Sequence, residues 1–152
     1  MATKDSTNDS MKVDSRNSAE GSKSSDAKKV LIAEDDAGVR RVITLTLQQA
    51  GLEVIPAQDG LEALDKATRL LPDAVLLDIG MPKMDGLTVC KRLRAGAKTS
   101  HIPIGFLTAE VGSKTYQEAA QAGSLLFMPK PFKPERLVSF VHVLLASSRK
   151  ER

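Results

Sequence analysis

Residues 30–36 read VLIAEDD, four apolar residues in a row followed by three carboxylates. An unbroken apolar run of this length is typical of a strand that is buried on both faces of a parallel sheet. Residues 74–78, AVLLD, repeat the pattern of an apolar run that ends on a carboxylate. Because parallel strands end at the same edge of a sheet, the two segments predict that acidic side chains from different parts of the chain meet there.

The alternation of short apolar runs with amphipathic segments continues along the chain. Strands are predicted at 30–33, 52–57, 74–77, 104–107 and 125–128, and helices at 37–50, 60–71, 87–95, 113–122 and 134–147. Five strands that are each followed by a helix predict an α/β fold, in which a doubly wound parallel sheet carries helices on both faces. The runs at 30–33, 74–77 and 125–128 are apolar on both faces, which is typical of central strands.

For two of the predicted helices, the sequence indicates which residues pack against the sheet. The segment 60–71 is expected to pack through four residues at helical spacing: Leu61, Leu64, Thr68 and Leu71. The segment 113–122 has few apolar anchors, namely Tyr116, Ala119 and Ala120. It is therefore predicted to be a loosely packed helix whose position can respond to a nearby site.

Composition limits the class of protein. The 152 residues suit one domain, and we expect it at 29–148, between a Ser-rich disordered tail at 1–28 and a short basic end at 149–152. The net charge of +3 comes from scattered basic residues without interleaved aromatic side chains, which argues against nucleic-acid binding. No apolar run approaches the length of a membrane span, and no secretion signal is visible.

The cysteine count fits a reducing compartment. The single cysteine, Cys90, cannot form an internal disulfide, so a cytoplasmic location is expected. Cys90 follows helical spacing with apolar residues of the segment 87–95, which favours a buried, inert thiol over a redox sensor.

The acidic side chains at the predicted sheet edge favour a metal site. Glu34 and Asp35 follow the first strand and Asp78 follows the third. Clustered carboxylates repel one another unless a cation neutralises them, and ligands with oxygen atoms alone favour Mg²⁺, with Mn²⁺ tolerated. The alternative for residues 34–36 is a solvated helix start, where acidic residues are common. Asp78 favours the metal site, because a buried strand positions it.

Four strings of the sequence together resemble the receiver domain of two-component response regulators. They are VLIAEDD at 30–36, DIGMPKMDG at 78–86, LTA at 107–109 and KPF at 130–132. Asp35, Asp78, Thr108 and Lys130 follow one another at intervals of 43, 30 and 22 residues. The resemblance covers about 29–148 and implies a flavodoxin-like sheet with the strand order 2-1-3-4-5.

The resemblance also implies a role for each residue of the site. Asp78 would accept a phosphoryl group from a histidine kinase or a phosphotransfer protein. Mg²⁺ would be held by Asp35, Asp78 and the backbone carbonyl of Gly80, with Glu34 acting through a water molecule. Lys130 and Thr108 would contact oxygens of the phosphoryl group. Beyond its own phosphorylation and dephosphorylation, no enzymatic activity on external substrates is expected.

Signal output would follow from a coupled movement of two side chains. The resemblance implies that the phosphoryl group draws Thr108 inward and that Phe127 fills the vacated space, although a strand aromatic such as Phe127 is equally expected to serve the core alone. A downstream protein would bind the face formed by 113–122, 125–128 and 134–147, which starts near Glu110 and includes Tyr116. The Lys130–Pro131 bond is a candidate cis peptide. A stand-alone regulator is expected, and homodimerisation stays open.

Three other functions are known for proteins of this topology or would suit an acidic site at this sheet edge. A flavin carrier of the same topology would need a loop rich in Gly, Ser and Thr at the first strand end, where the chain has acidic residues. A phosphatase with an Asp-x-Asp pair would need a carboxylate at position 80, which is glycine. A receiver-like interaction module that is never phosphorylated stays open as the alternative.

Two departures from the family's usual pattern bear on the site and the sheet. Gly80 offers a carbonyl but no side chain to control the attacking water, so the lifetime of the phosphorylated state stays open. Gly105 interrupts the fourth strand, which puts the rigidity of that strand in question.

Overall fold

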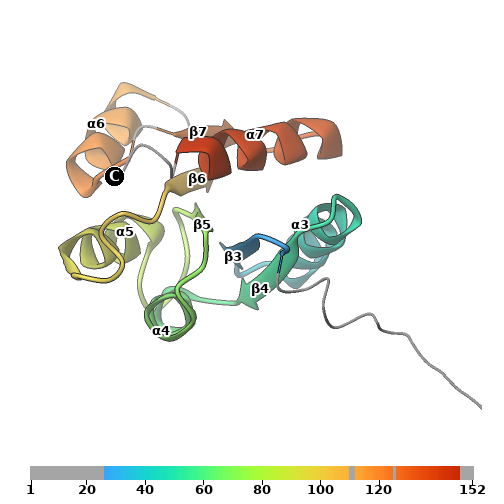
Figure 1. Ribbon diagram of the computed structural model, residues 1–152. Helices are drawn as coiled ribbons and strands as arrows, with labels where there is room; N and C mark the ends of the chain where they lie inside the picture. Colours follow the sequence, from blue (N-terminus) through green and yellow to red (C-terminus); the bar gives the residue numbers. More distant parts are fainter. Residues whose placement is uncertain (1–25, 110–111, 125, 148–152) are drawn as a thin grey trace, which may run out of the picture.

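The computed structural model describes residues 26–109, 112–124 and 126–147. The predicted tail at 1–28 lies outside the described residues except for its last three positions, and the basic end at 149–152 lies wholly outside them. Glu110, at which the output face was expected to start, is likewise not described. Figure 1 shows the arrangement of the described elements.

Within the described residues, five parallel strands form one sheet in the order β4-β3-β5-β6-β7. The strands are β3 (Lys29–Ala33), β4 (Glu53–Ala57), β5 (Ala74–Asp78), β6 (Ile104–Thr108) and β7 (Phe127–Pro129). In chain order this is 2-1-3-4-5, so the doubly wound α/β fold and its strand order are confirmed.

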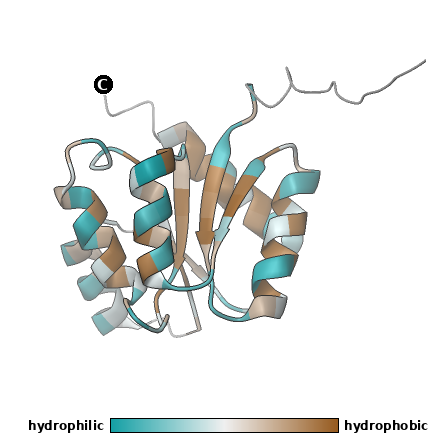
Figure 2. Cartoon of the chain, turned by 90° about the horizontal axis from the view of Figure 1, so that it is seen from below, coloured by the Kyte–Doolittle hydropathy of each residue, from teal (hydrophilic) through white to brown (hydrophobic). Residues whose placement is uncertain are grey.

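A helix follows each strand. The helices are α3 (Ala37–Gln49), α4 (Gly60–Leu70), α5 (Gly86–Ala95), α6 (Ser113–Ala122) and α7 (Pro134–Ser147). Buried residues of α4, α5 and α6 form one core cluster with one face of the sheet, whereas those of α3 and α7 form a second cluster with the other face. Figure 2 shows the apolar strands between helices whose polar residues face outward.

The inner strands are not the three that were expected. All five residues of β5 and of β6 are buried, and β3 lies between β4 and β5. The prediction that the run at 125–128 is a central strand was wrong, because β7 pairs with β6 and forms an edge of the sheet. Its apolar residues are explained by the two core clusters, since Met128 packs into one and Phe127 against the other.

Helix α4 packs through smaller residues than predicted. Its buried residues are Gly60, Ala63 and Ala67, while Leu64 packs from the edge of the core. The expectation for the other three positions was wrong, because these residues are exposed: Leu61, Thr68 and Leu71. Small side chains permit a close approach between α4 and its neighbours, so the helix turns its alanines rather than its leucines inward.

The glycine of the fourth strand makes room for a helix. A Cβ atom at Gly105 would lie 2.7 Å from the ring of Phe140 on α7 and 3.0 Å from Leu144. The strand β6 is nevertheless fully buried and paired on both sides. The absent side chain therefore accommodates the packing of α7 and leaves the strand intact.

Helix α6 has few buried residues, as expected, but two of its three predicted anchors were wrong. Of its described side chains, those of Ala119 and Ala122 are buried, whereas Ala120 is exposed and Tyr116 is 45% exposed, because the helix turns positions 119 and 122 toward the sheet. The helix therefore rests on the sheet through small contacts. None of the described helices combines the length and the apolar character that crossing a lipid bilayer requires.

Candidate functional site

The carboxyl ends of four strands bring the predicted residues to one edge of the sheet. Glu34 follows β3, Asp78 ends β5, Thr108 ends β6 and Lys130 follows β7. Backbone hydrogen bonds continue the sheet to this edge, since the amide of Ile79 donates to the carbonyl of Leu107 (3.1 Å) and that of Lys130 donates to the carbonyl of Thr108 (2.8 Å). Residues far apart in the sequence are thus held on a rigid frame.

Three carboxylates form a cluster at this edge. One carboxylate oxygen from each of Glu34, Asp35 and Asp78 lies within 4.8 Å of the others. Glu34 and Asp78 are 1% and 7% exposed, whereas Asp35 is exposed to solvent. Oxygen donors of this charge fit a hard divalent cation such as Mg²⁺, which retains several water ligands and therefore needs an open side. The exposed Asp35 and the exposed backbone of Gly80 provide that side.

Lys130 lies between two of these carboxylates. Its Nζ atom is 2.7 Å from Oε1 of Glu34 and 3.4 Å from Oδ2 of Asp78. Burial alone would lower the pKa of Lys130, but the hydrogen bond to Glu34 and the charge of Asp78 outweigh it, so the pKa is raised. Lys130 is therefore a fixed ammonium next to the Asp78 carboxylate.

Glu34 is held by contacts that sequence reasoning missed. Its Oε2 atom accepts the amide of Asp36 (3.1 Å), and its backbone carbonyl accepts Nη1 of Arg40 (2.8 Å). Burial raises the pKa of Glu34, and the hydrogen bond from Lys130 opposes this rise. The expected role through a water molecule did not include the direct bond to Lys130. Because the two residues are 96 positions apart, spacing along the chain gave no signal of this pair.

The proposed switch residues lie next to this cluster. Thr108 is buried at the end of β6. The ring of Phe127 on β7 contacts Phe106 of β6 (centroids 5.8 Å apart) and, edge to face, Tyr116 of α6 (4.6 Å, 74° between the planes). Phe127 therefore connects the sheet edge to α6 through Tyr116, a contact between two expected output residues that the sequence did not itself predict.

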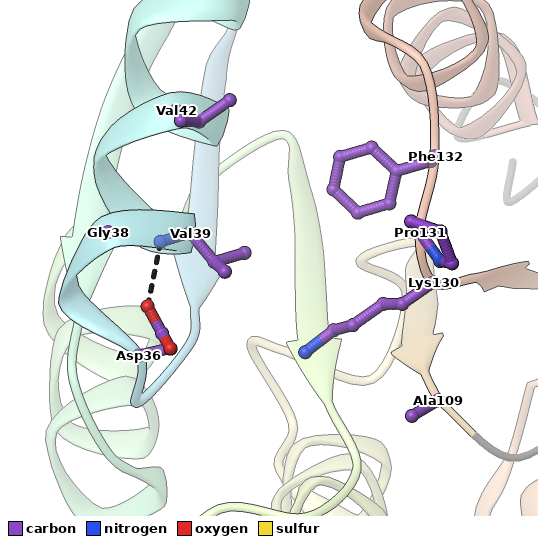
Figure 3. A pocket seen from close by; sticks show the side chains of 8 residues that line it. All are labelled: Asp36, Gly38, Val39, Val42, Ala109, Lys130, Pro131 and Phe132. Atoms are coloured by element: carbon purple, nitrogen blue, oxygen red, sulfur yellow. Dashed lines mark hydrogen bonds between the residues drawn. The ribbon is translucent and has the colours of Figure 1, made fainter.

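An apolar groove of about 760 Å³ opens beside the cluster. Val39 and Val42 of α3 form one wall, and Pro131 and Phe132 form the other. Figure 3 shows the ring of Phe132 facing α3 and Lys130 extending between the walls. The Lys130–Pro131 bond at the base of the second wall is cis. Asp36 also lines the groove and caps α3 by accepting the amide of Val39 (2.9 Å).

Cys90 lies outside the site and has a structural environment. Its thiol is buried and donates to the carbonyl of Ala122 on α6 (3.2 Å). Burial raises the pKa of the thiol to about 11, although the charge of Arg94 opposes the rise. A protonated thiol at neutral pH is a poor nucleophile, which agrees with the expected inert role.

Comparison with known proteins identifies the family. The model of the response regulator receiver domain matches residues 30–142, which is most of the chain. This chain belongs to the receiver domain family of response regulators. Receiver domains act in two-component signalling, and this assignment decides against the flavin carrier and the Asp-x-Asp phosphatase.

Solved receiver domains share the fold over nearly their whole length. The chemotaxis protein CheY4 of Vibrio cholerae is 36% identical with a TM-score of 0.76, and the alignment covers 78% of this chain and 99% of CheY4. The receiver domain of a sensor histidine kinase from Pseudomonas aeruginosa is 29% identical with a TM-score of 0.74, covering 79% and 98% of the two chains. Its crystal structure holds a magnesium ion in the active-site cleft.

Curated relatives are longer than this chain. The DNA-binding dual master transcriptional regulator RpaA of Synechocystis sp. is 35% identical over 117 residues, which cover 77% of this chain and 48% of RpaA. The response regulator MprA of a Mycobacterium species is 39% identical over 117 residues, which cover 77% of this chain and 50% of MprA. The chain therefore spans about half the length of the curated relatives it matches.

Proposed function

We propose that Asp78 of this receiver domain accepts a phosphoryl group from a phosphohistidine of a histidine kinase or a phosphotransfer protein. The observation that carries this proposal is the position of the Asp78 carboxylate, which belongs to the acidic cluster and also lies 3.4 Å from the ammonium of Lys130. A nucleophilic carboxylate flanked by a metal site and a fixed cation suits phosphoryl transfer, in which positioning and charge stabilisation supply most of the catalysis.

The transfer is an in-line exchange of one bond for another. An oxygen of Asp78 forms a bond to phosphorus while the bond between phosphorus and the donor imidazole nitrogen breaks, and the imidazole leaves with the electron pair. Lys130 would hold a phosphoryl oxygen as a point charge, and the hydroxyl of Thr108 would donate to another. Asp35, Asp78 and the Gly80 carbonyl would hold Mg²⁺ or Mn²⁺, with Glu34 acting through water, and the bound ion would neutralise charge that develops on the transferring oxygens.

The apolar groove supplies a place for the donor protein. It borders the acidic cluster through Asp36 and Lys130, and the walls from α3 and the loop after β7 are apolar. A partner helix that buries apolar side chains between these walls would bring its histidine to the open side of the site.

Output is proposed to pass through the face formed by α6, β7 and α7. The new charge on Asp78 would draw Thr108 toward the phosphoryl group, and Phe127 would move into the vacated space. The contact of Phe127 with Tyr116 supports this route, because it joins the sheet edge to a helix with few buried residues. We propose that this domain acts in the cytoplasm through a protein partner, without nucleic-acid contact of its own.

The test is phosphorylation by a small phosphodonor. Incubation with acetyl phosphate and Mg²⁺ should add the mass of one phosphoryl group to the wild type and none to Asp78→Asn. The control Asp85→Asn keeps the cap of α5, where Asp85 accepts the amide of Thr88 (2.8 Å), and should be labelled normally. Labelling of Asp78→Asn would contradict the assigned acceptor. Absence of any mass gain in the wild type would favour the interaction module that is never phosphorylated.

A further inference from the structure

The start of α4 touches the loop between β5 and α5 without room for a side chain. A Cβ atom placed on Gly60 would lie 1.8 Å from the carbonyl oxygen of Met84 and 2.6 Å from its carbonyl carbon. Both partners in this contact are backbone, so neither can rotate away as a side chain would. The first residue of α4 and the loop therefore fix each other's position.

The two ends of this loop, residues 79–85, lie close together. The amide of Gly86 donates to the carbonyl of Ile79 (3.0 Å), and a Cβ atom at Gly86 would lie 2.5 Å from the carbonyl oxygen of Asp78. Within the loop, the amide of Met84 donates to the carbonyl of Pro82 (2.7 Å), and Lys83 adopts a φ angle of 69°. The two ends of the loop thus meet at the backbone of Asp78 and Ile79.

Side chains strengthen the same contact. Met81, which is buried, and Met84 pack into the core cluster that contains Ala63 and Ala67 of α4. Nζ of Lys83 lies 3.6 Å from Oδ2 of Asp59, the residue that caps α4. This ion pair is a minor contribution because Lys83 is largely exposed. The rigid part of the contact is the backbone approach at Gly60.

Gly80 is linked directly to Asp78. The amide of Gly80 donates a hydrogen bond to Oδ1 of Asp78 (3.4 Å), and a Cβ atom on Gly80 would meet nothing within 4 Å among the described residues. Apart from that bond, the position of the Gly80 carbonyl depends on the rest of the loop, which is held by the bond between Gly86 and Ile79 and by the approach of Met84 to Gly60. A shift of Met84 would be passed to Gly80 through four peptide bonds of a compact loop.

We infer that Gly60 is a positioning residue for the metal and phosphoacceptor site. The start of α4 contacts the loop 79–85 and limits its position. This contact places the Gly80 carbonyl and the Asp78 carboxylate where they can share one metal ion with Asp35. The inference rests on the proposed function, since it assigns to Gly60 a role in the Mg²⁺ site. Gly60 contacts neither the metal nor the phosphoryl group, and it acts only through Met84.

The direct test is Gly60→Ala, with Mg²⁺ affinity measured by titration calorimetry on the full chain. We expect the affinity to fall at least tenfold, which corresponds to about 1.4 kcal/mol. The matched control is Gly112→Ala, where a Cβ atom meets nothing within 4 Å among the described residues. A second control is Ile43→Val, which destabilises the core on the opposite face of the sheet. Both controls should bind Mg²⁺ as the wild type does.

A readout without metal separates this inference from the proposed function. In metal-free protein, Gly60→Ala should accelerate hydrogen exchange of the Gly86 amide at least tenfold, while Ile43→Val at matched stability should not. If Gly60→Ala fails to fold, Met84→Ala replaces it, because it removes the side-chain anchor of the loop and should change both readouts in the same direction.

The outcomes distinguish the two ideas. Wild-type affinity and wild-type exchange in the folded Gly60→Ala or Met84→Ala variant would overturn the positioning role while the Mg²⁺ site stands. A wild type that binds no Mg²⁺ would contradict the proposed function, and the exchange rates alone would then decide the role of Gly60. An equal loss of affinity in Ile43→Val would also overturn the inference, because it would trace the effect to general stability.

Discussion

Charge balance at three side chains governs the chemistry of the site. Glu34 is 1% exposed, and its paired ammonium on Lys130 is 2.7 Å away. A buried carboxylate without such a partner carries a large desolvation cost, which is why burial raises the pKa of Glu34. We therefore propose two functions for Lys130: it stabilises Glu34 in the resting protein, and it would contact a phosphoryl oxygen on Asp78.

The double function predicts the behaviour of Lys130→Ala. Loss of the ammonium leaves the buried Glu34 carboxylate without a counter-charge, so the metal-free variant should lose about 2 kcal/mol of stability in denaturant unfolding. The variant should still be phosphorylated on Asp78, but its conformational response should be weakened, because no cation draws the phosphoryl group toward β7.

Two further variants control this prediction. Lys133→Ala removes an exposed lysine from the same loop and should change stability by less than about 0.5 kcal/mol. The double variant Lys130→Ala with Glu34→Gln should recover most of the lost stability, since the amide needs no counter-charge. Unchanged stability of Lys130→Ala, or no recovery in the double variant, would show that the pair does not act as described.

Helix α6 is the element that can report the state of the site. It buries two alanines, and its aromatic residue Tyr116 leans edge-on against Phe127 at 4.6 Å. A helix held by so few buried side chains can shift at small cost in free energy. The tilted contact between Phe127 and Phe106 then links that shift to β6, whose last residue is Thr108.

Intrinsic fluorescence can follow this shift, because Tyr116 is the sole tyrosine and the chain has no tryptophan. Addition of beryllofluoride and Mg²⁺, which mimic the phosphorylated state, should change the tyrosine emission of the wild type. Asp78→Asn should show no change, and Phe127→Leu should show a reduced one. An emission change of equal size in Asp78→Asn would mean that the signal reports the reagent and not the switch.

Across the whole molecule, metal binding and stability are linked. Mg²⁺ bound by the folded state and not by the unfolded chain raises the free energy of unfolding. At a Mg²⁺ concentration ten times the Kd, the gain is about 1.4 kcal/mol, which raises the melting temperature of a domain of this size by about 4 °C. Chelation with EDTA should reverse the rise in melting temperature.

Asp35, the exposed member of the proposed ligand set, provides a variant that tests this prediction. Asp35→Asn should melt like the metal-free wild type, with most of the Mg²⁺-dependent rise abolished. Asp65→Asn, which changes an exposed carboxylate paired with Arg69 on α4, should keep the full rise. A full rise in Asp35→Asn would remove Asp35 from the proposed ligand set.

Local sequence patterns were sufficient for the fold class and for the edge of the sheet that carries the site. The apolar runs before Glu34 and Asp78 indicate strands, because runs this short that end on polar residues suit buried strands better than helices, and the carboxyl ends of parallel strands lie at one edge of the sheet. The ranges predicted for α6 and α7 agree with the structure. These features depend on residues that are close in the sequence, so the spacing of apolar residues predicts them.

Packing between elements that are distant in the sequence determined the position of β7, the inward face of α4 and the contacts within the site. Whether the apolar run before Lys130 lies in the middle or at the edge of the sheet depends on which strands pair, and α4 turns its alanines inward because its neighbours lie close. The bond between Lys130 and Glu34, and the approach of Gly60 to Met84, join segments that no local pattern relates. Such contacts form only in the folded protein, because the packing of all the helices on the sheet determines which distant residues meet.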